Sequence, residues 1–131
     1  MIVVDSNTWA DYFNGADRPH VARLREALRD EEDLAVLPII VTEVLQGFRT
    51  DRGFGAAEQV LAALPAIHPD LDGHVRAAKL YRLLRGRGVT VRGAVDCVIA
   101  QTCIDLDALL LSPDRDFARI AEHTALRRWE P

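Results

Sequence analysis

The stretch Ile2-Val3-Val4-Asp5-Ser6-Asn7-Thr8-Trp9 joins a short apolar run to a polar cluster and then to a helical pattern. The β-branched residues of Ile2–Asp5 favour a buried strand. The next segment, Ser6–Asn14, carries three aromatic residues at helical spacing. A strand that leads directly into a helix is the beginning of an α/β unit, so this stretch predicts the fold class.

The same alternation continues along the chain. We expect further strands at Leu34–Leu37, Ala66–His68, Ala108–Leu111 and Leu126–Trp129. Helical patterns occupy Arg18–Glu32, Ile39–Arg49, Phe54–Leu64, Leu71–Arg85, Gly93–Asp105 and Pro113–His123. Alternating strands and helices predict an α/β domain with a mostly parallel sheet. With 131 residues and no internal repeat or linker, residues 1–131 are predicted to form one domain.

Composition excludes several classes of protein. Hydrophobic residues make up 49% and charged residues 27% of the chain, which is typical of a globular domain. No apolar stretch approaches the roughly 18 residues of a spanning helix, and the start lacks the basic region of a signal peptide. We therefore expect a cytoplasmic protein without a membrane partner. Cys97 and Cys103 lie about 240° apart around a helix, which favours two buried hydrophobes over a bridge or a shared metal.

The net charge of −4 argues against a protein that simply coats nucleic acid, because such proteins are usually basic. Divalent cations weaken this objection, since two bound Mg²⁺ ions would bring the total charge to zero. The charge balance therefore permits a nuclease without indicating one.

Three acidic residues stand at the ends or starts of predicted elements in the first three quarters of the chain. Asp5 follows the first strand, where it could cap the helix or bind a ligand. Glu43 lies in a largely apolar run at the start of a helix, where it is either a solvated edge residue or a buried ligand. Asp96 is the only acid in Val91–Thr102. Its partner is either Arg92, one turn earlier, or a metal ion.

Two more acids, Asp114 and Asp116, open the final helix. Ser112 as the N-cap and Pro113 at the first helical position would make a good helix start for structural reasons alone. Both acids also follow the fourth strand directly. In open α/β sheets, ligands bind beyond the carboxyl ends of the strands, so the same edge is expected to hold Asp5.

The conjunction of five acids predicts a metal site. Like charges brought this close would repel one another, and a divalent cation removes that conflict. Carboxylates without clustered His or Cys favour Mg²⁺ or Mn²⁺ over zinc. Such an ion polarises a phosphodiester oxygen and lowers the pKa of the attacking water. Nearby arginines, which otherwise form solvated faces and ion pairs, could hold the phosphate backbone: Arg92 and Arg115, with Arg82, Arg85 and Arg87 as weaker candidates.

Four segments, in order, resemble the motifs of PIN-domain ribonucleases. They are Val3-Val4-Asp5-Ser6-Asn7-Thr8-Trp9, Thr42-Glu43-Val44-Leu45-Gln46-Gly47, Val91-Arg92-Gly93-Ala94-Val95-Asp96-Cys97-Val98-Ile99-Ala100 and Leu110-Leu111-Ser112-Pro113-Asp114-Arg115-Asp116-Phe117. The chain's size also resembles the VapC-type toxins of toxin–antitoxin pairs. Two residues depart from the family pattern: Pro113 after Ser112, and Asp107, which we interpret as a turn acid outside the site.

The resemblance implies a Rossmann-like α/β/α PIN fold with a central twisted sheet of four to five short strands. It implies a Mg²⁺- or Mn²⁺-dependent endoribonuclease, a homodimer, and a cognate VapB-type antitoxin that joins it in a heterotetramer or larger assembly. Carried over by residue, Asp5, Glu43, Asp96 and Asp114 would hold the metal, Asp116 would assist catalysis, and Ser112 and Asn7 would contact substrate.

The resemblance also implies an apolar groove for the antitoxin. Five aromatic residues are candidates for that groove or for a dimer contact, although helix-spaced aromatics are also typical of a core: Trp9, Tyr12, Phe13, Phe48 and Phe54.

Three other functions compete with this hypothesis. A phosphoaspartyl hydrolase of the haloacid dehalogenase type needs a second Asp where this chain has Asn7. A response-regulator module needs paired acids and a late lysine, but the only lysine is Lys79, on a predicted helix. A PIN-like protein without catalysis would not need all five acids. The ribonuclease hypothesis is the one that uses the whole acidic set.

Overall fold

The computed structural model describes residues 1–131. Its centre is one sheet with the strand order β2-β1-β3-β4. These strands are β1 (Ile2–Val4), β2 (Leu34–Ala35), β3 (Leu109–Leu111) and β4 (Arg127–Arg128). All three pairings are parallel, and the register sets Val4 beside Leu111 and Leu110 beside Arg128. The carboxyl ends of the strands therefore meet at one edge, as the sequence predicted.

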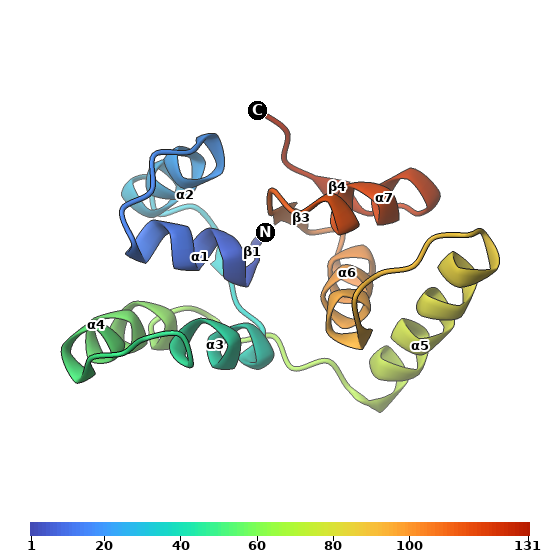
Figure 1. Ribbon diagram of the computed structural model, residues 1–131, viewed down its shortest axis with the longest axis horizontal. Helices are drawn as coiled ribbons and strands as arrows, with labels where there is room; N and C mark the ends of the chain where they lie inside the picture. Colours follow the sequence, from blue (N-terminus) through green and yellow to red (C-terminus); the bar gives the residue numbers. More distant parts are fainter.

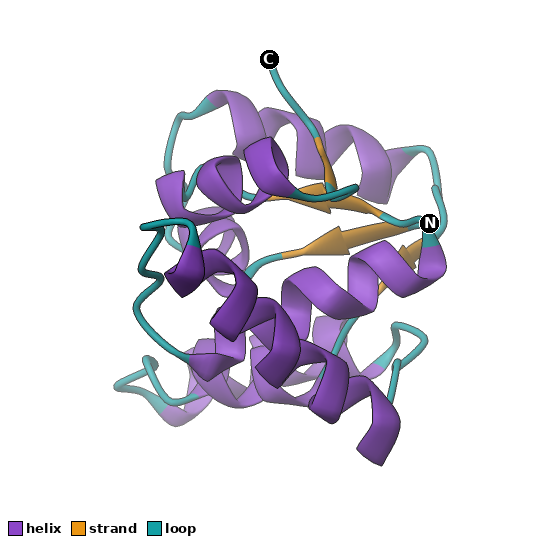
Figure 2. Ribbon diagram, turned by 90° about the vertical axis from the view of Figure 1, so that its right-hand side faces the viewer, coloured by secondary structure: helices purple, strands orange, loops and turns teal.

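Helices cover both faces of this sheet, which gives the predicted α/β/α layering (Figure 2). Their order along the chain can be followed in Figure 1. They are α1 (Ser6–Phe13), α2 (Pro19–Arg29), α3 (Pro38–Leu45), α4 (Asp51–Ala62), α5 (Leu71–Gly86), α6 (Ala94–Leu106) and α7 (Arg115–His123). None of these helices is long and apolar enough to cross a membrane.

The core lies where the sheet meets these helices. Val3, Val4, Leu110 and Leu111 are completely buried, because strands of a parallel sheet are covered on both faces. Cys97 and Cys103 are free, buried thiols of this core, as predicted. Burial raises the pKa of the Cys97 thiol to about 11 and that of Cys103 to about 12, so both are inert at neutral pH.

Several predicted bounds differ by a few residues from the observed ones, as for the helix predicted over Ile39–Arg49, which ends at Leu45. One predicted strand and the predicted start of the last helix were wrong. The segment Ala66–His68 does not form a strand but makes one parallel bridge, from Ala66 to Val36. The last helix begins at Arg115 instead of Pro113, and its N-cap is Asp114 instead of Ser112. Asp114 Oδ1 accepts a hydrogen bond from the Asp116 amide at 2.9 Å. The Ser112 hydroxyl instead donates to Asp5 Oδ2 and accepts a hydrogen bond from the amide of Asp114, the residue before the helix.

Asp107 ends α6 in the left-handed region, with φ of 50°. An aspartate tolerates this conformation better than most residues other than glycine. Its carboxylate accepts a hydrogen bond from Arg127 Nε at 2.9 Å. The interpretation of Asp107 as a turn acid is therefore confirmed.

Candidate metal and catalytic site

Four of the five predicted acids line one cavity of about 260 Å³ at the carboxyl edge of the sheet. Asp5 comes from the end of β1, Glu43 from α3, Asp96 from the first turn of α6, and Asp114 from the loop after β3. The lining is completed by Ser6, Asn7, Arg92, Gly93 and Val95. Segments far apart in the sequence thus bring their carboxylates to one place.

Asp5 is the most deeply buried of these acids, with 4% of its surface exposed. Its amide donates to the Leu111 carbonyl at 3.1 Å, which ties the end of β1 to β3. Burial is the main reason why the pKa of this carboxyl is raised; hydrogen bonds from Ser6 and Ser112 oppose the increase. Asp5 occupies the N-cap position of α1, but its side chain makes no capping hydrogen bond. The capping alternative is therefore excluded for Asp5.

Ser112 connects two of the acids. Its hydroxyl donates to Asp5 Oδ2 at 3.1 Å and accepts a hydrogen bond from the Asp114 amide at 3.1 Å. Only 3% of Ser112 is exposed. Since both of these contacts are internal, the geometry gives Ser112 a positioning role between Asp5 and Asp114. The predicted direct contact between Ser112 and substrate stays a prediction.

Glu43 lines the cavity, and one of its carboxylate oxygens lacks a hydrogen-bond partner. Its Oε1 atom is buried and has no hydrogen-bond partner. Burial and then the charge of Asp5 raise the pKa of Glu43. A buried carboxylate oxygen without a donor is unfavourable unless a cation or a proton satisfies it. This oxygen is therefore free to bind a cation or to carry a proton.

The pKa of Asp96 is affected by all four of the other acids. Burial is the main cause that raises its pKa to about 6, and the charges of the other four acids, Asp5, Asp114, Asp116 and Glu43, add to the effect. The predicted alternative, an ion pair with Arg92, was wrong. Arg92 precedes the N-cap Gly93 and is not part of α6, so it does not lie one helical turn from Asp96.

Asp116 belongs to the group although it does not line the cavity. Carboxylate oxygens of Asp96, Asp114 and Asp116 all lie within 4.8 Å of one another, so the three could hold one ion. Asp116 Oδ2 also accepts a hydrogen bond from the Arg92 amide at 3.4 Å, and its Oδ1 lies 3.6 Å from Arg119 Nη1. Asp116 is therefore shared between the acidic group and the loop before α6.

Some of the predicted substrate-binding residues line the acidic cavity and others lie outside it. Arg92 and Asn7 are exposed and line the cavity, so both can reach a substrate there. Arg115 is exposed at the start of α7 but is not part of the lining. Arg87 donates to the His123 carbonyl, and the guanidinium of Arg85 lies 5.7 Å from the ring centre of Tyr81. These last two arginines have structural contacts of their own.

Sequence reasoning missed two polar residues around the acids. Ser6 donates to Asp5 Oδ1 at 3.5 Å, and its position next to Asp5 was the available signal. Arg119 donates to the Thr90 carbonyl at 3.3 Å and approaches Asp116. Nothing in the sequence alone marks Arg119, because Thr90 is 29 residues away.

A divalent cation fits this arrangement. Hard cations bind carboxylate oxygens, and the group offers five of these side chains with an orphaned Glu43 oxygen among them. None of the four histidines lines the acidic cavity or belongs to the group of Asp96, Asp114 and Asp116.

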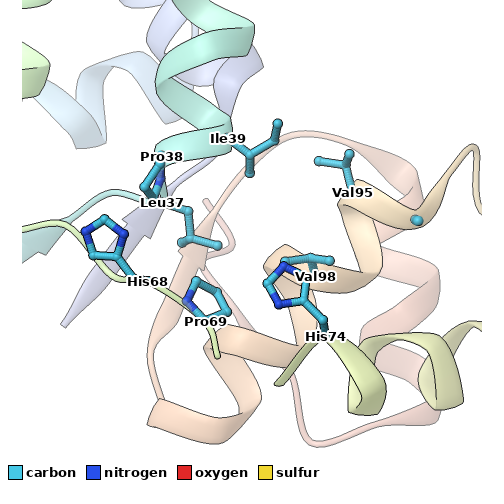
Figure 3. A pocket seen from close by; sticks show the side chains of 9 residues that line it. Leu37, Pro38, Ile39, His68, Pro69, His74, Val95 and Val98 are labelled. Atoms are coloured by element: carbon cyan, nitrogen blue, oxygen red, sulfur yellow. The ribbon is translucent and has the colours of Figure 1, made fainter. Parts of the chain in front are cut away.

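A second, apolar cavity of about 420 Å³ adjoins the first, and Val95 lines both. Figure 3 shows Ile39, Val95 and Val98 around it, with the imidazoles of His68 and His74 on either side of Pro69. The remaining lining residues are Leu37, Pro38 and Ala94. An apolar cavity directly beside a polar one is suited to a peptide segment that covers the acids.

The aromatic residues predicted for such a groove lie elsewhere. Trp9 is completely buried, stacks on Phe13 and meets Tyr12 edge to face. Phe13 in turn packs against Phe48 with ring centres 5.8 Å apart. A groove role for Trp9 was therefore wrong, because its ring forms part of the core that holds α1 on the sheet. Phe54 keeps 38% of its surface exposed.

The chain is similar to known proteins over nearly its whole length. The family described as PIN domain matches residues 2–123. A VapC ribonuclease of Mycobacterium bovis and the ribonuclease VapC11 of Mycobacterium tuberculosis are each 33% identical over 129 residues, which is 97% of this chain and 96% of theirs. Two solved structures share the fold at lower identity. VapBC2 of Rickettsia felis, bound to a promoter DNA fragment, has a TM-score of 0.78, 19% identity and 98% coverage of both chains. VapBC-1 of Haemophilus influenzae has a TM-score of 0.74, 20% identity and coverage of 99% and 98%.

Proposed function

This chain belongs to the PIN-domain family, and we propose that it is a Mg²⁺- or Mn²⁺-dependent endoribonuclease, the toxin of a VapBC-type toxin–antitoxin pair. The observation that carries the proposal is the convergence of Asp5, Glu43, Asp96, Asp114 and Asp116 at one edge of the sheet. The two curated relatives that match nearly the whole chain are named as VapC ribonucleases.

Asp5, Glu43, Asp96 and Asp114 would hold the cation, with Asp116 as a further ligand or helper. When bound, the cation supplies positive charge that neutralises the phosphodiester and makes water a better nucleophile. Ser112 fixes the Asp5 and Asp114 carboxylates relative to each other through its two hydrogen bonds. Arg92 and Asn7, exposed on the wall of the cavity, would orient the RNA backbone. Attack of water on phosphorus would leave a 3′-hydroxyl and a 5′-phosphate.

The antitoxin would cover this site from the apolar cavity around Ile39 and Val95. This cavity shares Val95 with the acidic one, so a segment seated on the apolar residues would lie directly beside the metal ligands. Solved VapBC assemblies of the same fold contain such a toxin and antitoxin together. A neighbouring gene of about 70–90 codons encoding a DNA-binding protein is expected, in line with the small size of such modules.

The activity is tested with purified, antitoxin-free protein, structured RNA and either Mg²⁺, Mn²⁺ or EDTA. We expect cleavage only with metal, and loss of cleavage in Asp5→Asn. The matched control is Asp105→Asn, which removes an exposed carboxylate on α6 that pairs with Arg76 away from the cavity. Full cleavage by Asp5→Asn would refute the assigned site. Light scattering on the same sample measures whether the free toxin is a homodimer.

A further inference from the structure

A third cavity, of about 300 Å³, adjoins the acidic group at Ser112. It is lined by Pro19, His20, Ser112, Pro113, Arg128, Trp129 and Pro131. Ser112 belongs to both places, because it lines this cavity while its hydroxyl binds Asp5 Oδ2 at 3.1 Å. Pro113, the family departure noted above, separates the cavity from Asp114. The third cavity is thus one residue away from the carboxylates that would bind metal.

The lining of this cavity is mainly apolar and includes two basic side chains. Three prolines and the Trp129 ring supply the apolar surface, and His20 and Arg128 supply polar groups. The backbone of Trp129 is fixed, since its amide donates to the Leu110 carbonyl at 2.9 Å. The volume is at the lower limit of small-molecule pockets, which span about 300–1,000 Å³, so one ring system fits better than a larger ligand.

Two basic side chains, His20 and Arg128, line this cavity, and each has an acidic partner. The imidazole of His20 lies 3.0 Å from Asp11 Oδ2. The guanidinium of Arg128 pairs through Nη2 with Glu130, an exposed residue, while its Nε is buried without a partner. The side chain of Glu130 is 71% exposed and that of Arg128 is 20% exposed, and ion pairs with one partner open to water contribute little, so an incoming phosphate or base could compete with Glu130. Arg18 and Arg115 are exposed and stand next to the lining residues Pro19 and Pro113 in the sequence, and Arg18 Nε lies 3.9 Å from Asp11 Oδ2.

We propose that this cavity binds one unpaired nucleobase of the RNA substrate, stacked on Trp129 and adjacent to the phosphodiester held at the acidic site. Proteins recognise single-stranded RNA by stacking splayed bases on aromatic rings and on arginine planes. This inference rests on the proposed ribonuclease function for the identity of its ligand. It assigns to Trp129 and Arg128 a contribution to substrate selection that the acids cannot make, because carboxylates and their cation contact only the backbone.

Trp129 fluorescence tests the proposal directly. The chain has two tryptophans, and Trp9 is completely buried, so quenching by a ligand reports on Trp129. In EDTA, which prevents cleavage, the protein is titrated with a ten-nucleotide single-stranded RNA and with an abasic ribose-phosphate strand of equal length. We expect quenching by the first only. We also expect about tenfold weaker RNA binding, measured by anisotropy of a labelled strand, for Trp129→Ala, since one base stack is worth about 1–3 kcal/mol.

Trp129→Phe keeps a stacking ring and should bind RNA nearly as well as the wild type. Trp129→Phe can replace Trp129→Ala in the binding experiment if the alanine variant is unstable. If Trp129 only packs against the protein, the base-bearing and the abasic strand will bind with equal affinity. Equal affinity for the two strands, or unchanged affinity in Trp129→Ala, would overturn the base site while metal-dependent cleavage remained intact. Conversely, base-dependent quenching without any cleavage in Mg²⁺ or Mn²⁺ would support this site and refute the proposed nuclease activity.

Discussion

Replacing Asp96 by Asn should make the metal-free protein more stable and at the same time abolish its response to Mg²⁺. Burial and four neighbouring carboxylates raise the pKa of Asp96 from 3.8 to about 6. Since the folded-state pKa is higher than the unfolded one, the stability contribution of this group is fully present below pH 3.8. It is lost as the pH rises through about 6. At pH 7.5 the folded wild type therefore bears the full free-energy cost of an ionised Asp96, whereas an asparagine at this position cannot ionise.

The magnitude follows from the shift in pKa. About two pKa units at roughly 1.36 kcal/mol each correspond to about 3 kcal/mol. Asp96 is partly exposed, and screening by water reduces this figure to about 1–2 kcal/mol. For a domain of this size, such a change raises Tm by about 4–8 °C.

The assay is thermal unfolding in EDTA at pH 7.5 and pH 4.5, followed by the same measurement in Mg²⁺. Asp96→Asn should exceed the wild type at pH 7.5, and the difference should shrink at pH 4.5. Asp105→Asn, on the same helix but paired with Arg76 at 2.8 Å, should show no increase at either pH. If Asp96→Asn is less stable than the wild type at both pH values, mutual repulsion does not dominate this site. If Mg²⁺ still raises its Tm as in the wild type, Asp96 is not a metal ligand.

Three further predictions follow from the same geometry. Mg²⁺ should raise the Tm of the wild type more at pH 7.5 than at pH 5.0, because protons compete with the ion for carboxyls whose pKa values are raised, above all that of Asp96. An equal increase in Tm at the two pH values would argue against these carboxyls as ligands. Ser112→Ala should lower the rate of RNA cleavage at least tenfold and the free energy of unfolding by about 1–3 kcal/mol, because a buried Asp5 oxygen and the Asp114 amide both lose their partner. Single-turnover kinetics measures the first effect and urea unfolding the second. A cleavage rate equal to that of the wild type would contradict the positioning role of Ser112. Trp9→Ala should lower the free energy of unfolding by about 3–5 kcal/mol in urea, because the ring is completely buried, whereas Phe54→Ala should have a much smaller effect; similar losses would mean that burial does not separate the two.

Much of the fold could be predicted because local patterns and tertiary packing agree. The apolar run Ile2–Asp5, the alternation of strands and helices and the placement of acids at element ends all led to a parallel sheet with carboxylates at one edge. Boundaries were predicted less well where a tertiary contact competes with a local signal. Ser112 has the residue type of an N-cap, but hydrogen bonds to Asp5 and Asp114 take its hydroxyl, so the helix begins later. Arg92 has the spacing of an ion-pair partner for Asp96, but the helix starts after it.

By itself the sequence determined which residue types stand at the ends of which elements. This was sufficient to predict the fold class and to select the five acids that the fold brings to one edge of the sheet. Only the tertiary structure decided how these groups act on one another. It left Glu43 Oε1 buried without a partner, grouped Asp116 with Asp96 and Asp114, and placed Trp9 in the core. It also placed the cavity lined by Trp129 and Arg128 next to Ser112. The physical reason is that distance, burial and electrostatic coupling depend on the packing of segments up to 107 residues apart, such as Asp5 and Ser112, which no local spacing encodes.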